Sequence, residues 1–170
     1  MYEALLKANA KRGKAALYPP ATFTPLQELV FGSFLTKEYS VEAAALFNPS
    51  IVPHPDQSGL ADGETRFVLT LRSVGEGHIS SVGLMEGVID SFDQIHFTPQ
   101  GPWRTAGDKL LPPHGDDDLY DITFDANIPL SERVIFPQAA SESMGMEDLR
   151  MVKFEDKGET KYLGTYTAYN

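Results

Sequence analysis

After Asn48 the sequence consists of short β-rich runs separated by turn-forming residues, and this alternation limits the fold more than any other feature. The runs are TRFVLTLRS, HISSVGLM, GVIDSF, QIHFTP, YDITFD, RVIFPQ, LRMVKFED and KYLGTYTAY, with Gly, Pro, Asp and Asn between them. Short strands at regular spacing are typical of a β-sandwich, a β-barrel or a β-propeller. The last two runs are joined by Asp156, Lys157 and Gly158, which predict a tight hairpin turn.

A helix is expected within TPLQELVFGSFL, residues 24–35. Thr24 is suited to the N-cap, Pro25 to the first helical position, and Gln27 to the position that completes a capping box with Thr24. The apolar residues of this segment share one helical face; they are Leu26, Leu29, Val30 and Phe34. An earlier helix is expected from Tyr2 to Arg12, because Gly13 is suited to end it.

These patterns divide the chain into an N-terminal helical arm, residues 1–45, and a β-rich domain, residues 46–170. The segment SVEAAALF, residues 40–47, fits either a short helical turn begun by Ser40 or the approach to the first strand. Residues 98–121 are rich in Pro, Gly and Asp and are expected to form a long surface loop.

Composition excludes several classes of function. The chain of 170 residues contains no cysteine, which rules out disulfides, thiolate catalysis and cysteine-bound metals. Its net charge of −10 disfavours nucleic acid as a partner and is compatible with a neutral ligand such as a sugar. No apolar run is long enough to span a membrane, and the N-terminus lacks the apolar core of a secretion signal, so cytoplasm is the expected compartment.

Metal chemistry is not expected from the histidines, because their spacing does not bring pairs together on a helix or a short loop. They are His54, His78, His96 and His114.

The segment GMEDLR, residues 145–150, is the densest cluster of candidate chemistry. If a strand begins at Asp148, its period of two places Asp148 and Arg150 on one face, and Glu147 and Leu149 on the other. Arg150 would favour the ionised form of Asp148, whereas a bound sugar that excludes water would favour the protonated acid. The pair is therefore either a general acid with its orienting arginine or a structural ion pair.

Four segments, in this order, resemble glycoside hydrolase family 130, the β-mannoside phosphorylases and β-1,2-mannosidases. They are EYSVEAAALFNPSIVPHPD, GEGHISSV, ERVIFPQAASESMGMEDLR and YLGTYTAYN, and they run from Glu38 to Asn170. The resemblance implies a five-bladed β-propeller with its active site at the mouth of the central channel. It also implies action on β-linked mannosides with inversion, by phosphorolysis or by hydrolysis. Inorganic phosphate would be the co-substrate of a phosphorylase, and neither an organic cofactor nor a metal is implied.

The resemblance also implies roles for individual residues. Asp148 would be the general acid, and Arg150 would orient the substrate or phosphate. The other substrate-binding residues implied in this way are Asn48, Ser50, Arg72 and His78. The chain departs from the family pattern at Leu149 and at Leu84, Met85 and Glu86. Glu86 would repel phosphate if its carboxylate pointed into the pocket.

Length limits how much of a propeller this sequence can form. A blade needs about 40–45 residues, so the ~125 residues after the helical arm correspond to two to three blades. We therefore expect an N-terminal portion of an inverting β-mannoside phosphorylase, incomplete for catalysis on its own, with manno-oligosaccharides as substrate. One alternative is a β-1,2-mannosidase. Another is a non-catalytic carbohydrate-binding or assembly module, whose exposed strand edges would invite pairing into a homo-oligomer.

Overall fold

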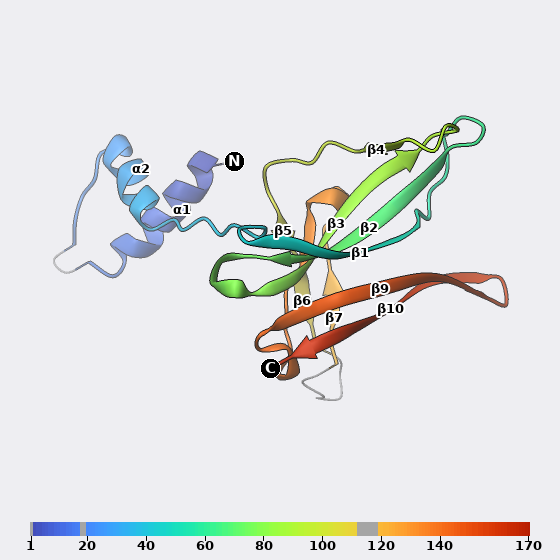
Figure 1. Ribbon diagram of the computed structural model, residues 1–170. Coiled ribbons are helices and arrows are strands. Elements are labelled where there is room, and N and C mark those ends of the chain that lie inside the picture. Colours follow the sequence, from blue (N-terminus) through green and yellow to red (C-terminus); the bar gives the residue numbers. More distant parts are fainter. Residues whose placement is uncertain (1, 18–19, 112–118) are drawn as a thin grey trace. The chain divides into compact units, whose positions relative to one another are not determined.

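A computed structural model of the chain describes residues 2–17, 20–111 and 119–170 (Figure 1). It is mainly β, with two α-helices, so the predicted mainly-β class is confirmed. The chain divides into two compact units, residues 1–39 and residues 40–170. The expected boundary at residue 45 lies a few residues inside the second unit.

The first unit contains helix α1 (Tyr2–Lys14) and helix α2 (Pro25–Phe34). The predicted capping box is confirmed, because the Gln27 N–H donates to Thr24 Oγ1 at 3.3 Å and the Thr24 N–H donates to Gln27 Oε1 at 2.9 Å. Helix α1 continues through Gly13 to Lys14, so the expected end at Arg12 is two residues too early.

The apolar face predicted for α2 forms, but it is largely exposed within the described residues. Leu26, Val30 and Phe34 are 70%, 49% and 84% exposed. Neither α1 nor α2, the α-helices of the described ranges, is long and apolar enough to cross a bilayer.

The second unit is built on an antiparallel meander of consecutive strands (Figure 1). Its strands are β1 (Ala45–Pro53), β2 (Thr65–Val74), β3 (Ser80–Ile89) and β4 (Ile95–Phe97). The runs HISSVGLM and GVIDSF, which the sequence suggested as separate strands, form the single strand β3 because no break occurs at Gly87. SVEAAALF contains a turn at residues 41–42 and then enters β1 at Ala45, so it combines a turn with the start of the strand.

Short strands extend this sheet. Strand β8 (Arg133–Ile135) pairs antiparallel with β3, and β5 (Thr105–Ala106) pairs parallel with β8. Strands β6 (Asp108–Leu110) and β7 (Asp121–Thr123) form a separate two-stranded sheet. The segment expected as one long loop, residues 98–121, therefore contains β5 and β6, and its residues 112–118, His114 among them, lie outside the described part of the chain.

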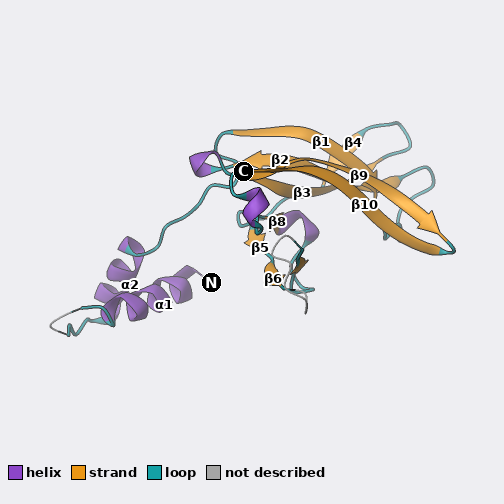
Figure 2. Ribbon diagram, turned by 90° about the horizontal axis from the view of Figure 1, so that it is seen from below, coloured by secondary structure: helices purple, strands orange, loops and turns teal. Residues whose placement is uncertain are grey.

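The chain ends in a long hairpin of β9 (Gly145–Asp156) and β10 (Glu159–Tyr169). Lys157 and Gly158 have φ values of 50° and 84°, as a two-residue hairpin turn of the primed type requires, so the predicted turn is confirmed. The start of β9 touches β3 through a parallel bridge between Ser80 and Gly145. Figures 1 and 2 show β9 running beside β1, and β9 also contacts β2 and β3.

The core of the second unit lies on β2, β3 and β8 and mixes apolar with hydroxyl side chains. Phe67 is 1% exposed and meets Phe97 edge-to-face at 5.8 Å between ring centroids. The buried hydroxyls are Thr70, Ser73, Ser80, Ser81 and Ser131. The larger of the two sheets in the described residues is mixed and does not close on itself. The structure therefore supports the mainly-β class but not a propeller.

Candidate functional site

A β-bulge in β1 positions Asn48. Phe47 pairs with Arg72 and Ser50 pairs with Thr70, so two residues of β1 face the single residue Leu71 of β2. Asn48, the first of the two, has a φ of 48°. Asparagine tolerates this left-handed conformation better than most residues do, which explains why the bulge forms here.

A second bulge, in β9, positions Asp148. Glu147 pairs with Thr167 and Arg150 with Thr165, so Asp148 and Leu149 together face the single residue between those threonines. Asp148 has a φ of 56°, again a conformation that aspartate tolerates. The two bulges lie side by side because β9 runs along β1.

The paired bulges bring together three strands at one point. The Asn48 side-chain amide donates a hydrogen bond to Asp148 Oδ1. Arg72 Nη1, from β2, lies 3.8 Å from the same oxygen, and Arg72 Nη2 forms an ion pair with Glu147. We call Asn48, Arg72, Glu147 and Asp148 the bulge cluster. The Asp148 side chain remains 42% exposed, so a ligand can reach it from solvent.

Arg72 is fixed from several directions. Its Nε donates to the buried Ser80 Oγ at 3.0 Å, and its guanidinium lies 5.7 Å from the ring centroid of Phe47. With two carboxylates in contact with one end, the guanidinium has little rotational freedom. The cluster thus presents a rigid cation between two acids of different exposure, since the Glu147 side chain is only 20% exposed.

The predicted side-chain alternation in GMEDLR is wrong, and the bulge is the reason. The extra residue in β9 breaks the period of two, so Glu147 and Asp148 both reach Arg72. Arg150 points elsewhere: its Nη1 donates to the carbonyl oxygen of Pro49 at 2.7 Å, and the residue is exposed. The guanidinium beside Asp148 is therefore that of Arg72.

Of the two remaining predicted residues, Ser50 lies beside the bulge cluster and His78 does not contact it. Ser50 Oγ accepts a hydrogen bond from the Met151 N–H at 2.9 Å and so ties β1 to β9 just beyond the bulges. His78 lies in the 3-10 helix Glu76–His78, with a φ of 61° and an exposed side chain. Among the described contacts, none joins the His78 ring to the bulge cluster.

Glu147 is the cluster residue that the sequence interpretation missed. Its adjacency to Asp148 was visible, but regular strand geometry assigned it to the opposite face. A bulge leaves little trace in a single sequence, since Asn48 and Asp148 are suited to positive φ without requiring it.

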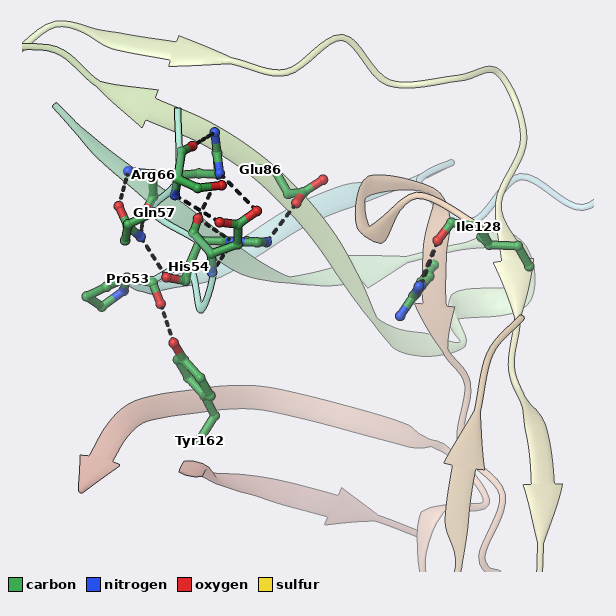
Figure 3. A network of polar contacts seen from close by, with 10 residues as sticks. Pro53, His54, Gln57, Arg66, Glu86, Ile128 and Tyr162 are labelled. Carbon is green, nitrogen blue, oxygen red and sulfur yellow. Dashed lines mark hydrogen bonds and ion pairs between the residues drawn. The ribbon is translucent and has the colours of Figure 1, made fainter. Parts of the chain in front are cut away.

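Glu86 contacts a different part of the second unit (Figure 3). Its Oε1 lies 3.1 Å from His54 Nε2, while His54 Nδ1 accepts from the Asp56 N–H at 2.9 Å. Along β3, Glu86 pairs with Val68 and Val82 pairs with Arg72. The four intervening steps correspond to roughly 13 Å at the usual strand rise, so the carboxylate of Glu86 is directed to His54 and not to the bulge cluster.

Tyr162 makes another link between β10 and β1, because its hydroxyl donates to the carbonyl oxygen of Pro53 at 2.7 Å (Figure 3).

No group of three or more His, Asp or Glu side chains among the described residues is arranged to hold a metal ion. His96 pairs with Asp90 at 2.7 Å on the surface.

No family model, no curated protein and no solved structure matches this chain. The bulge cluster therefore has to be interpreted from its own chemistry. It offers a solvent-accessible carboxylate for proton transfer, an amide and a guanidinium for polar groups of a ligand, and a second carboxylate that balances the charge of the guanidinium.

Proposed function

We propose that the bulge cluster is the acid-donating and sugar-binding part of an inverting enzyme that acts on β-mannosides, by phosphorolysis of manno-oligosaccharides. One observation carries the proposal: Asn48, Arg72 and Asp148 come from three strands, and Asn48 and Asp148 are 100 positions apart, yet they form one polar cluster. The family resemblance assigned a role to each of these residues separately. Their convergence in space is what a shared ligand would require.

In this proposal a phosphate oxygen attacks the anomeric carbon from the side opposite the leaving group while the bond to the glycosidic oxygen breaks. Asp148 gives its proton to the departing oxygen, directly or through a sugar hydroxyl. Its exposed edge is available for this role, while the amide of Asn48 orients the carboxylate from the side. Arg72 and Asn48 bind hydroxyl groups of the mannosyl unit, and Ser50 supports the bulges by holding Met151. A positioned acid of this kind contributes roughly 10²–10⁴-fold to the rate of such a reaction.

We propose further that the second unit is part of a five-bladed β-propeller, in the form of two to three blades. Two features support this assignment. The antiparallel meander of β1, β2, β3 and β4 has the connectivity of one four-stranded blade. The β9–β10 hairpin runs beside β1, where the inner strands of a neighbouring blade would lie.

Phosphorolysis is favoured over hydrolysis by the charges around the cluster. Glu86, which would repel phosphate from the pocket, is engaged with His54 at a distance from the cluster. The exposed guanidinium of Arg150 lies next to the bulge of β1 and is a cation that phosphate can approach. Hydrolysis by a β-1,2-mannosidase is the alternative within the same class.

Binding is the first test, because it does not require a complete catalytic apparatus. Titration of the ¹⁵N-labelled chain with β-1,2-mannobiose should shift the amide signals of Asn48, Arg72 and Asp148 before others, with cellobiose as the control sugar. The proposal fails if mannobiose moves no signal in the millimolar range, or moves only signals remote from the two bulges.

Turnover is the second test. In a protein that joins this chain to the remaining blades, β-1,2-mannobiose and inorganic phosphate should yield mannose 1-phosphate. Asp148→Asn in that protein should reduce the rate at least ~100-fold while mannobiose still binds, because only the proton donor is lost. Asp93→Asn is the matched control, since Asp93 also has a positive φ, of 61°, but lies in an exposed turn. Mannose released equally with and without phosphate would favour the hydrolase. Binding without any product from the protein that contains all blades would favour the carbohydrate-binding module.

A further inference from the structure

Glu142 is a buried carboxylate that makes no contact in the bulge cluster. It ends the 3-10 helix Ala140–Glu142, shortly before β9 begins at Gly145, and its relative exposure is 0%. Four hydrogen bonds converge on this carboxylate. The donors are the Tyr120 hydroxyl at 2.6 Å, the Tyr166 hydroxyl at 2.5 Å, the Gln138 N–H at 2.8 Å and the Ala139 N–H at 3.0 Å.

These bonds keep Glu142 ionised although it is buried. Burial by itself would raise the pKa of Glu142, but the hydrogen bonds from both tyrosines and both N–H groups outweigh burial and lower it. Burial and the bond to Glu142 raise the pKa of Tyr120, so its proton stays on the hydroxyl. A buried charge with four donors is costly to rearrange and therefore defines the position of each donor.

One of these donors lies at the bulge of β9. Thr165 pairs with Arg150 and Thr167 with Glu147, so Tyr166 is the residue of β10 that faces the two bulged residues. A bulge can move along a strand pair, and a shift of one residue turns each side chain to the other face of the sheet. The orientation of Glu147 and Asp148 therefore depends on the register of β10 against β9, in which Tyr166 lies opposite the bulge.

We infer that Glu142 is a positioning residue, which holds Tyr166 opposite the bulge of β9 and thereby keeps Glu147 and Asp148 directed at Arg72. This role goes beyond the proposed function, because it concerns the geometry of the ligand-free protein and applies to whatever ligand the cluster binds. It also assigns a use to a carboxylate that would otherwise be costly to bury.

Two conservative variants of the full chain test the role. Tyr166→Phe and Tyr120→Phe each remove one hydroxyl from the same carboxylate and keep the aromatic ring, so both lose a donor to Glu142. The Tyr120 hydroxyl additionally lies 3.9 Å from Met146 Sδ. Only Tyr166 faces the bulge. The amide NMR signals of Asn48 and Asp148 in the ligand-free protein should move, or split into two sets, in Tyr166→Phe and stay in place in Tyr120→Phe.

The same variants have a second readout, which rests on the proposed function. Mannobiose should bind about tenfold more weakly to Tyr166→Phe than to Tyr120→Phe, the size expected when a charge-assisted contact is lost. If the unsubstituted chain does not bind mannobiose, the proposed function fails, but the ligand-free signals still decide the positioning role.

If Tyr166→Phe does not fold, Glu142→Gln takes its place, because glutamine has nearly the same shape and still accepts from one tyrosine. The positioning role of Glu142 is supported if Glu142→Gln displaces the amide signals of Asn48 and Asp148 and leaves the signals of residues remote from β9 unchanged. Equal effects of the two tyrosine variants, or signals of Asn48 and Asp148 that no variant moves, would overturn it.

Discussion

Asn48 and Asp148 show how much the bulge cluster depends on two single backbone conformations. Both residues have positive φ, and both side chains take part in the same hydrogen bond. Any β-branched residue at these positions would be strained, whereas asparagine and aspartate tolerate the conformation. Uncommon backbone conformations at neighbouring positions of two strands often mark functional sites, and here they bring side chains of β1 and β9 into contact with Arg72 of β2.

Glu142 makes stability depend on pH in a predictable direction. Its pKa is lower in the folded chain than its ordinary value of 4.5. A carboxyl group of this kind stabilises the fold at pH above its unfolded value, and the contribution is lost as pH falls through the folded value. We expect acidification below pH 4.5 to reduce the free energy of unfolding more steeply in the unsubstituted chain than in Glu142→Gln.

Urea unfolding followed by circular dichroism at neutral and at acidic pH measures this difference. At neutral pH, Glu142→Gln should be less stable by about 1–3 kcal/mol, because glutamine cannot accept all four hydrogen bonds. Asp62→Asn, at an exposed carboxylate, is the control and should change little. Parallel pH profiles for Glu142→Gln and the unsubstituted chain would contradict the prediction.

At the scale of elements, the segments that carry local signals were predictable and the irregularities were not. Thr24, Pro25 and Gln27 identified the start of α2, and Lys157 with Gly158 identified the last turn. Both features are encoded within a few neighbouring residues. The bulges of β1 and β9 depend on pairing between distant strands, so the face on which Glu147 lies could not be obtained from the period of two.

Gly145 sets where β9 begins relative to β3. It has a φ of 141°, and a Cβ at this position would lie 2.8 Å from Ser80 Cβ and 3.0 Å from Ser80 N. Gly145→Ala should therefore destabilise the chain by about 1–3 kcal/mol and displace Ser80, which binds Arg72 Nε. Gly59→Ala is the control, because Gly59 has a φ of 70° with open space around it.

Thermal unfolding and the side-chain Nε–Hε NMR signal of Arg72 measure the two effects. Gly59→Ala should show only the cost of backbone strain, about 1–2 kcal/mol, with the Arg72 signal in place. An Arg72 signal that is the same in Gly145→Ala and in the unsubstituted chain would show that the bridge between β3 and β9 does not position Ser80.

At the scale of the whole molecule, composition and strand spacing were sufficient for the mainly-β class and for the helical residues at the N-terminus. They were not sufficient for the sheet order β1-β2-β3-β8-β5, because β8 and β5 are short, and the pairing of β8 with β3 is set by packing around Val82 and Val134. Asn48, Arg72 and Asp148 were predicted as individual residues. Their direct contact became visible only in three dimensions.

The division into two units leads to a prediction about the entire chain. Every contact of the bulge cluster and of Glu142 described above is made within residues 40–170, which form a compact unit. A chain that lacks residues 1–39 should therefore unfold cooperatively, with a free energy of unfolding for this unit within about 1 kcal/mol of its value in the full chain. Its amide signals for Asn48 and Asp148 should match those of the full chain. Chemical denaturation and NMR decide the matter: if removal of α1 and α2 displaces those two signals, the helical unit takes part in shaping the cluster, and the cluster is not a property of the β unit alone.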